Sequence, residues 1–292
     1  MRSKLFIPAS RPELFLKALN SNADGLSFDL EDSVREDKKG EARKNLANFF
    51  SSKEFAPCAK TVIVRVNPMG TAYFNDDIAA IVRDGVNIIN LPKAESVEDI
   101  KAAVKVIESA EAKNGVDIDG AKPTRLLLNI ETPKSLRIAC ELASADPRVM
   151  GLQVGLGDLF EPYGIDRKQI IAVEQVLFQV AMAAHEANVF AFDGAYANIA
   201  DQAGYRAEAV LAKSLGFQGK SCIHPSQIEL ANAVFRPSDE EIAFSLKVLE
   251  AESRAQLNSV GAFVVDGKMI DPPFVNRARS IINLANKLGI HS

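Results

Sequence analysis

Eight short apolar runs, each ending in polar residues, constrain the fold of this chain more than any other feature of its sequence. The runs are rich in β-branched residues, and segments with apolar residues at helical spacing separate them. They are "KLFIPAS" from Lys4, "LSFDLED" from Leu26, "TVIVRVNP" from Thr61, "NIINLPK" from Asn87, "RLLLNIET" from Arg125, "VMGLQVGLGD" from Val149, "VFAFDG" from Val189 and "KSCIHP" from Lys220. Strands that are apolar throughout and alternate with helices form parallel sheets covered on both faces. Eight such units predict an α/β fold, a closed (β/α)8 TIM barrel.

The residues after the eighth run predict a smaller second segment. Ser238, followed by acidic residues, is typical of a helix start. "GAFVVDGKMIDPP" predicts a hairpin that turns at Asp266-Gly267, and "FVNRARSIINLANKL" predicts an amphipathic helix. We therefore expect a catalytic barrel over residues 1–236 and a helix-hairpin-helix lid over residues 237–292. This tail is too small for an independent core, so we expect it to pack on the barrel or on another subunit.

The composition argues against several classes of protein. The formal net charge of -4 is mild and no basic stripe is visible, so we expect no nucleic-acid partner. No apolar run reaches the roughly 18 residues that span a bilayer, and the apolar run at the N-terminus is too short for a signal peptide. The three cysteines are far apart and show no CxxC spacing. They predict neither a disulfide framework nor a zinc site, and they favour the cytoplasm. The sequence has no GxGxxG motif after a predicted strand and no GxxxxGK[ST] motif, which argues against a nucleotide-binding fold.

Polar residues follow the predicted strands where each strand ends, which is the catalytic face of such a barrel. The set is Ser10 with Arg11, Asp29, Glu31, Asp32, Arg65 with Asn67, Lys93, Glu131, Asp158, Asp193 and His224. Glu131 and Asp158 end neighbouring strands. Two carboxylates with room for waters and substrate oxygens suit Mg²⁺, with Mn²⁺ as an alternative. The glycines of "GLGD" would let the backbone near Asp158 approach a ligand closely. Alternatively, each carboxylate caps the following helix or pairs with a basic residue.

Several of these side chains have two readings. Arg65 can hold a carboxylate or an enolate oxygen through its forked donors, or it forms a structural ion pair with Asp29 or Glu31. The acidic residues of "DLED" would orient Arg65 or metal-bound waters, and Lys93 either joins that network or stays solvated. His224 is a candidate base by its near-neutral pKa, although a structural role is commoner. Asp271, before two prolines, lies in a rigid setting that would raise its pKa, and composition leaves its role undecided.

The ordered motifs "LFIPASRPE", "DLEDSV", "VRVNP", "LPKAES", "NIETP", "GLGD", "CIHPSQI" and "GKMIDPP" resemble the citrate lyase β-subunit-like family of the HpcH/HpaI aldolase superfamily. The resemblance runs from Lys4 to about Leu284, and the family includes malyl-CoA and citramalyl-CoA lyases. It implies a Mg²⁺-dependent barrel, commonly a homotrimer. It also implies roles for eight residues: Glu131 and Asp158 as metal ligands, Arg65 as the oxyanion-stabilising arginine, Glu31 and Asp32 near the metal, its waters and the substrate, Arg11 and Lys17 at the CoA phosphates, and Asp271 as an acid/base in a neighbouring subunit's site. The family often has "VPGSRP" where this chain has "IPASRP", so Ala9 alters the thioester-side loop.

The activity that the resemblance implies is cleavage of a carbon–carbon bond beside a thioester. A citramalyl-CoA or malyl-CoA type of substrate would give acetyl-CoA and a 2-keto acid such as pyruvate or glyoxylate, or the reverse Claisen-type condensation would run. Two enzymatic alternatives stay open. One is a citrate lyase β subunit acting on a citryl thioester of an acyl carrier protein, and the other is a malyl-CoA thioesterase or malate-synthase-like variant. A catalytically silent barrel is a further reading, against which the presence of Arg65, Glu131 and Asp158 argues.

Overall fold

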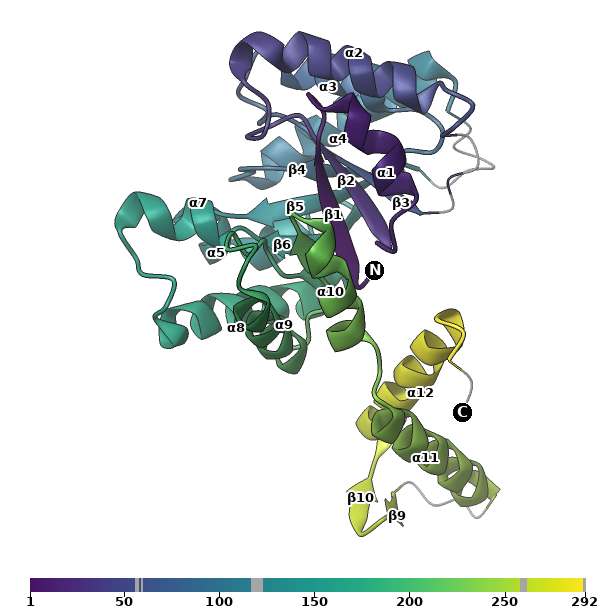
Figure 1. Ribbon diagram of the computed structural model, residues 1–292. Coiled ribbons are helices and arrows are strands. Elements are labelled where there is room, and N and C mark those ends of the chain that lie inside the picture. Colours follow the sequence, from purple (N-terminus) through teal and green to yellow (C-terminus); the bar gives the residue numbers. More distant parts are fainter. Residues whose placement is uncertain (56–57, 59, 117–122, 258–261, 291–292) are drawn as a thin grey trace. The chain divides into compact units, whose positions relative to one another are not determined.

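The eight predicted strands form one parallel sheet in the computed structural model, which describes residues 1–55, 58, 60–116, 123–257 and 262–290. The order of the strands is β7-β6-β5-β4-β3-β2-β1-β8 (Figure 1). The strands are β1 (Ser3–Pro8), β2 (Gly25–Asp29), β3 (Thr61–Arg65), β4 (Ile88–Leu91), β5 (Arg125–Ile130), β6 (Val149–Val154), β7 (Phe190–Phe192) and β8 (Lys220–Cys222).

Two junctions that involve β8 close the sheet into a barrel. On one side β8 pairs with β1, with Lys220 opposite Ser3. On the other side Asp193, directly after β7, forms a parallel bridge with Lys220. There the Asp193 N–H donates to the carbonyl of Gly219 at 2.9 Å, and the Ser221 N–H donates to the carbonyl of Asp193 at 3.0 Å. The predicted (β/α)8 barrel is therefore confirmed.

Helices lie outside the strands and connect most of them (Figure 1). They are α1 (Phe15–Leu19), α2 (Lys39–Phe50), α3 (Phe74–Ile81), α4 (Val97–Asn114), α5 (Pro133–Arg137), α6 (Ala139–Ala143), α7 (Leu156–Phe160), α8 (Ile170–Glu186), α9 (Gln202–Ser214) and α10 (Ile228–Phe235), with short 3₁₀ turns η1 (Pro12–Leu14), η2 (Glu36–Lys38), η3 (Glu161–Tyr163) and η4 (Pro225–Gln227). Local sequence sets their ends: the Ser96 hydroxyl accepts the Asp99 N–H at the start of α4, and Gly115, at φ 68°, ends it. In the part of the chain that is described, no helix has the length and apolar character needed to cross a membrane.

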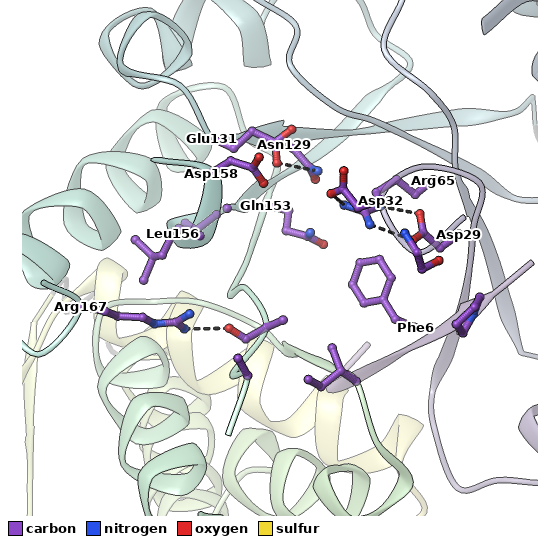
Figure 2. A pocket seen from close by; sticks show the side chains of 18 residues that line it. Phe6, Asp29, Asp32, Arg65, Asn129, Glu131, Gln153, Leu156, Asp158 and Arg167 are labelled. Carbon is purple, nitrogen blue, oxygen red and sulfur yellow. Dashed lines mark hydrogen bonds and ion pairs between the residues drawn. The ribbon is translucent and has the colours of Figure 1, made fainter. Parts of the chain in front are cut away.

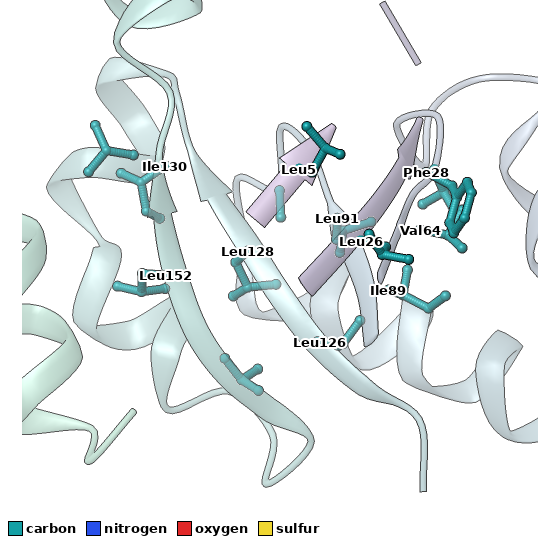
Figure 3. Packing of buried hydrophobic residues seen from close by; sticks show 14 of the residues in the cluster. Leu5, Leu26, Phe28, Val64, Ile89, Leu91, Leu126, Leu128, Ile130 and Leu152 are labelled. Carbon is teal, nitrogen blue, oxygen red and sulfur yellow. The ribbon is translucent and has the colours of Figure 1, made fainter. Parts of the chain in front are cut away.

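The two faces of each strand have different neighbours, and this alternation positions the site. On β5, Leu126, Leu128 and Ile130 belong to the large core between strands and helices (Figure 3). Leu127 belongs to a smaller cluster with the β-strand residues Ile63, Ile88 and Phe192, inside the barrel. Successive side chains of a strand point to opposite faces. The side chains of residues 129 and 131 therefore share the inward face with residue 127.

Residues Arg236–Ser292 form a second compact unit, and Met1–Phe235 form the first. The second unit contains α11 (Asp239–Leu257), β9 (Phe263–Val265), β10 (Lys268–Ile270) and α12 (Pro272–Lys287). Ser238 and Glu241 form a capping box: the Ser238 hydroxyl accepts the Glu241 N–H at 3.1 Å, and the Glu241 carboxylate accepts the Ser238 N–H at 2.8 Å. Asp266 and Gly267 turn the hairpin at φ 47° and 78°, the left-handed values that a two-residue turn needs. The predicted elements are present, and their packing on the barrel or on a neighbour stays a prediction.

Candidate active site

A cavity of about 510 Å³ lies at the carboxyl ends of the strands, where the barrel fold predicts the site. Its walls come from β1, β2, β3, β5 and β6 and from the loops after β7 and β8 (Figure 2). Five of the predicted strand-end residues line it: Asp29, Asp32, Arg65, Glu131 and Asp158. The strand ends thus bring together residues as far apart in the sequence as Asp29 and Asp158.

Glu131 is held in place by one donor on each carboxylate oxygen. The side chain is 2% exposed. Oε1 accepts the backbone N–H of Lys93 at 3.0 Å, and Oε2 accepts the amide of Asn129 at 3.1 Å. Lys93 adopts φ 52°, which is uncommon for a residue with a side chain and marks a constrained turn after β4. Each carboxylate oxygen can accept two bonds, so both oxygens of Glu131 keep capacity for a further ligand.

Gly155 explains how Glu131 and Asp158 come close together. A Cβ at position 155 would lie 2.5 Å from the Cβ of Glu131 and 2.8 Å from its Oε2. Only glycine therefore lets the end of β6 pass Glu131 without displacing it. Gly157 has open space around it. The close approach at Gly155 is to the Glu131 side chain, and the predicted approach of the "GLGD" backbone to a ligand stays a prediction. Three residues after Gly155, Asp158 lies in the first turn of α7 and points into the same cavity (Figure 2).

Arg65 is fixed by the acidic residues that follow β2. Its Nε and Nη2 donate to the two oxygens of Asp29 at 2.7 and 2.8 Å, a bidentate pair. Its Nη1 donates to Asp32 at 3.2 Å and lies 2.8 Å from Oε2 of Glu31. The structural ion pair that the sequence left open is therefore present. It does not exclude a role in binding, because the guanidinium still lines the cavity, with its carbon 5.2 Å from the centre of the Phe6 ring.

Lys93 joins the carboxylates of this network. Its ammonium lies 3.3 Å from Glu31 and 3.5 Å from Asp158. The structure therefore favours the network over the solvated alternative. Carboxylates nevertheless outnumber cations here. Burial, together with the nearby charges of Glu31 and Asp158, raises the pKa of Glu131 to about 7. Burial also raises the pKa of Glu31 to about 7, although Arg65 and Lys93 oppose the shift.

This donor set fits a hard divalent cation. Oε2 of Glu31 is buried and accepts no hydrogen bond from the residues that the structure describes, although it lies 2.8 Å from Nη1 of Arg65. A cation at the cluster would offset the surplus negative charge that burial makes costly. Among the described residues, no group of three or more His, Cys, Asp or Glu side chains is arranged to hold a metal by itself. Two carboxylates, with waters or substrate oxygens completing the coordination, are how Mg²⁺ is usually held.

Glu31, Arg11, Lys17 and Asp271 are not among the described residues that line this cavity. Arg11 is exposed and pairs with Glu13 at 2.9 Å, and Lys17 is an exposed residue of α1. Asp271 belongs to the second unit, at the residue before α12, where its Oδ1 is buried and accepts no hydrogen bond from any described residue. The roles of these four residues, and those of the cavity residues, stay predictions.

Two strand-end residues that the sequence left undecided have structural partners. The Nδ1 of His224 accepts the Ser226 N–H at 3.2 Å, so the imidazole caps η4. Asp193 is buried against Lys220, with 2.6 Å between the carboxylate and the ammonium. Both residues thus serve the ends of their strands.

Sequence reasoning missed a second group of polar residues beneath the carboxylates. Asn129, Gln153 and Arg167 line the cavity, and Lys4 and Asn90 are buried below them. Four of the five residues lie on a strand, with side chains that point into the barrel. Each is two positions from another residue that points inward. The sequence could have revealed them, because a polar residue two positions before the polar end of a strand lies on the same face as that end.

Residues 2–225 match the model of the HpcH/HpaI aldolase/citrate lyase family. The chain belongs to this family. The predicted resemblance is confirmed, and so is the expectation of a lyase of this family.

Two relatives and one solved structure are similar over nearly the whole chain. The citrate lyase subunit beta of Haemophilus influenzae is 32% identical over 292 residues, which cover 99% of this chain and 98% of that protein. The L-malyl-CoA/beta-methylmalyl-CoA lyase of Rhodobacter capsulatus is 29% identical over 97% of this chain and 94% of that protein. The protein CitE of Mycobacterium tuberculosis, solved in complex with magnesium, acetoacetate and coenzyme A, is 31% identical with a TM-score of 0.76, over 98% of this chain and all of that one.

Proposed function

We propose that this protein is a Mg²⁺-dependent carbon–carbon lyase that acts on a 3-hydroxyacyl-CoA thioester of the malyl-CoA or citramalyl-CoA type. The products would be acetyl-CoA and a 2-keto acid such as glyoxylate or pyruvate, and the reverse condensation uses the same groups. One observation carries the proposal: Glu131 and Asp158, at the ends of adjacent strands, share one cavity with the clamped guanidinium of Arg65. The named activity of the Rhodobacter capsulatus relative and the ligands of the solved CitE structure support it.

The proposed reaction needs a metal site, a group that stabilises the enolate and a proton donor. Glu131 and Asp158 would hold Mg²⁺, which would supply a positive charge that binds oxygens of the keto-acid half and stabilises developing negative charge. The hydroxyl proton would pass to a water molecule in the cavity, and its oxygen would become the keto oxygen. The electron pair of the broken C–C bond then moves onto the thioester half as an enolate.

Arg65 would stabilise the enolate oxygen with its positive charge. Asp29, which holds Arg65 from the side, keeps the guanidinium preorganised for this role. Asp271 of a neighbouring subunit would give a proton to the enolate carbon, and Arg11 and Lys17 would meet the CoA phosphates. No covalent enzyme intermediate is required.

The test is a mass-spectrometric screen of hydroxyacyl-CoA cleavage with and without Mg²⁺. We expect release of glyoxylate or pyruvate with acetyl-CoA, lost on chelation and in Glu131→Ala, and lowered in Asp271→Asn. Metal binding without turnover of any hydroxyacyl-CoA would refute the proposal. Free acid appearing with CoA and without a keto acid would select the thioesterase or malate-synthase-like variant.

A second candidate is a citrate lyase β subunit that cleaves a citryl thioester on an acyl carrier protein. The full-length similarity to the citrate lyase subunit beta of Haemophilus influenzae favours it. Co-purification with a carrier protein, and indifference to free CoA esters, would select this candidate over the first.

We also propose a homotrimer in the cytoplasm. The free thiols of Cys58, Cys140 and Cys222 fit a reducing compartment. An exposed apolar strip on α8, made of Ile171, Phe178 and Met182, offers a surface for self-association.

A further inference from the structure

A lysine lies buried at the floor of the cavity. Lys4, on β1, is 1% exposed. Its ammonium lies 4.3 Å from the centre of the Phe6 ring, which lines the cavity. A buried ammonium is costly unless hydrogen bonds compensate it. Its partners therefore determine what the position contributes.

Both hydrogen bonds of Lys4 go to the carbonyl oxygens of side-chain amides. Nζ donates to Oδ1 of Asn90 at 3.3 Å and to Oε1 of Gln153. An ammonium has donors and no acceptor, so each amide must turn its oxygen toward Lys4 and its NH2 group away. Burial lowers the pKa of Lys4. A neutral amine would still have two N–H donors for these two oxygens, so the orientation of both amides is the same in either state.

The amide of Asn90 is connected by hydrogen bonds to Glu131, the carboxylate expected to hold the metal. Nδ2 of Asn90 donates to Oδ1 of Asn129 at 2.7 Å, and Nδ2 of Asn129 donates to Oε2 of Glu131 at 3.1 Å. Every bond from Lys4 to Glu131 thus runs in one direction, and each bond polarises the next. The chain aims an N–H at the carboxylate, which favours its charged form and fixes its orientation.

The other amide points its donors at the cavity. Gln153 lines the cavity and lies between the Glu131–Asp158 pair and Phe6 in Figure 2. Its Oε1 is taken by Lys4, and its Nε2 donates to no acceptor within the described residues. An oxygen of a bound molecule is the partner that such an N–H lacks. A keto or carboxylate oxygen of a 2-keto acid has this chemistry.

We propose that Lys4 is a positioning residue with two roles. Through Asn90 and Asn129 it orients Glu131, and through Gln153 it presents an N–H donor to an oxygen of the keto-acid half of the substrate. The second role rests on the proposed function, whereas the first concerns divalent-metal binding alone.

Two titrations on the full chain test the two roles of Lys4 separately. One follows Mn²⁺ binding by electron paramagnetic resonance. The other follows pyruvate, glyoxylate and oxaloacetate binding to the Mg²⁺-loaded protein by calorimetry. Asn90→Leu should weaken Mn²⁺ binding about 10-fold and leave keto-acid binding unchanged, because one bond to a charged group is lost. Gln153→Met should do the reverse, and Lys4→Met should weaken both.

The control is Lys60→Met. Within the described residues, Lys60 donates to the backbone carbonyls of Ser21 and Ala23 at 2.6 and 2.8 Å, and it precedes β3 at the opposite end of the barrel. It should change neither titration. The double variant Lys4→Met/Gln153→Met should bind the keto acid no more weakly than Lys4→Met. Each of the two changes removes the same donor, the oriented Nε2 of Gln153. A merely structural lysine would give additive losses.

The outcomes separate the two proposals. Unchanged Mn²⁺ affinity in Lys4→Met, or equal losses in both titrations for Asn90→Leu and Gln153→Met, would overturn the role of Lys4. A wild-type protein that binds Mn²⁺ but no keto acid would overturn the proposed function and the role of Gln153. The Mn²⁺ titration would still decide the role of Lys4 toward Glu131.

Discussion

Replacing Gly155 by alanine should damage the site through one added methyl group. The new Cβ would lie 2.5 Å from the Cβ of Glu131, where ordinary contact begins at 3.4 Å. Glu131 or the end of β6 must therefore move by about 1 Å to remove the overlap. Forcing a methyl group into a packed interior costs about 1–3 kcal/mol of unfolding free energy. A displacement of about 1 Å at a reacting centre can cost on the order of 100-fold in turnover.

Gly157→Ala is the matched control, two residues away in the same motif. No atom lies within 4 Å of a Cβ built there, and position 157 is helical. Alanine in a helix is more stable than glycine by roughly 0.5–1 kcal/mol. The two substitutions should therefore change stability in opposite directions. Urea unfolding gives the stability, and a Mn²⁺ titration gives the state of the metal site. Wild-type Mn²⁺ affinity and turnover in Gly155→Ala would refute the packing argument.

Three further outcomes follow from particular contacts. A Mg²⁺ concentration 100 times the dissociation constant should raise the unfolding free energy by about 2.7 kcal/mol, and calorimetric melting should detect no such gain in Glu131→Ala. Burial raises the pKa of Glu111, but the Arg148 guanidinium, 2.9 Å away, opposes this shift, and the pKa lies below its usual value. The stability that this carboxylate contributes is therefore present above the unfolded pKa and lost as pH falls through the folded one. Glu111→Gln should lower stability at neutral pH and flatten the acid side of a urea-midpoint profile, and parallel profiles would contradict this. Phe178→Glu on α8 should reduce self-association in sedimentation velocity, whereas Val210→Glu, exposed to a similar degree on α9, should not; equal effects would argue against the α8 surface.

The fold could be predicted because its signals are local. Each apolar run leads into polar residues, and each of the eight barrel strands falls within one of the runs or begins one residue before it. The hairpin was predictable from Asp266-Gly267, since two left-handed residues in succession need such a pair. The carboxylate pair was predictable because the ends of parallel strands meet at one rim.

The interior of the site depends on contacts that no local pattern contains. The Lys93 N–H reaches Glu131 from a strand 38 residues away, and its φ of 52° is a tertiary constraint with no sequence signal. Lys4 is the first residue of the apolar run "KLFIPAS", and nothing in that run indicates a buried ammonium. Its partners Asn90 and Gln153 come from strands that the barrel brings to the same level of its interior. Pairing of this kind needs the register of the sheet, which the sequence alone does not specify.

A Mn²⁺ titration of three proteins tests the central claim most directly, namely that Glu131 and Asp158 together hold one divalent cation. Electron paramagnetic resonance counts the free ion, and the comparison is between wild type, Glu131→Gln and Asp158→Asn. We predict one site per chain in the wild type. We also predict a loss of at least about 10-fold in affinity in each variant, since each loses a charged ligand. Full-affinity binding in both variants, or none in the wild type, would contradict the metal site and the lyase mechanism built on it.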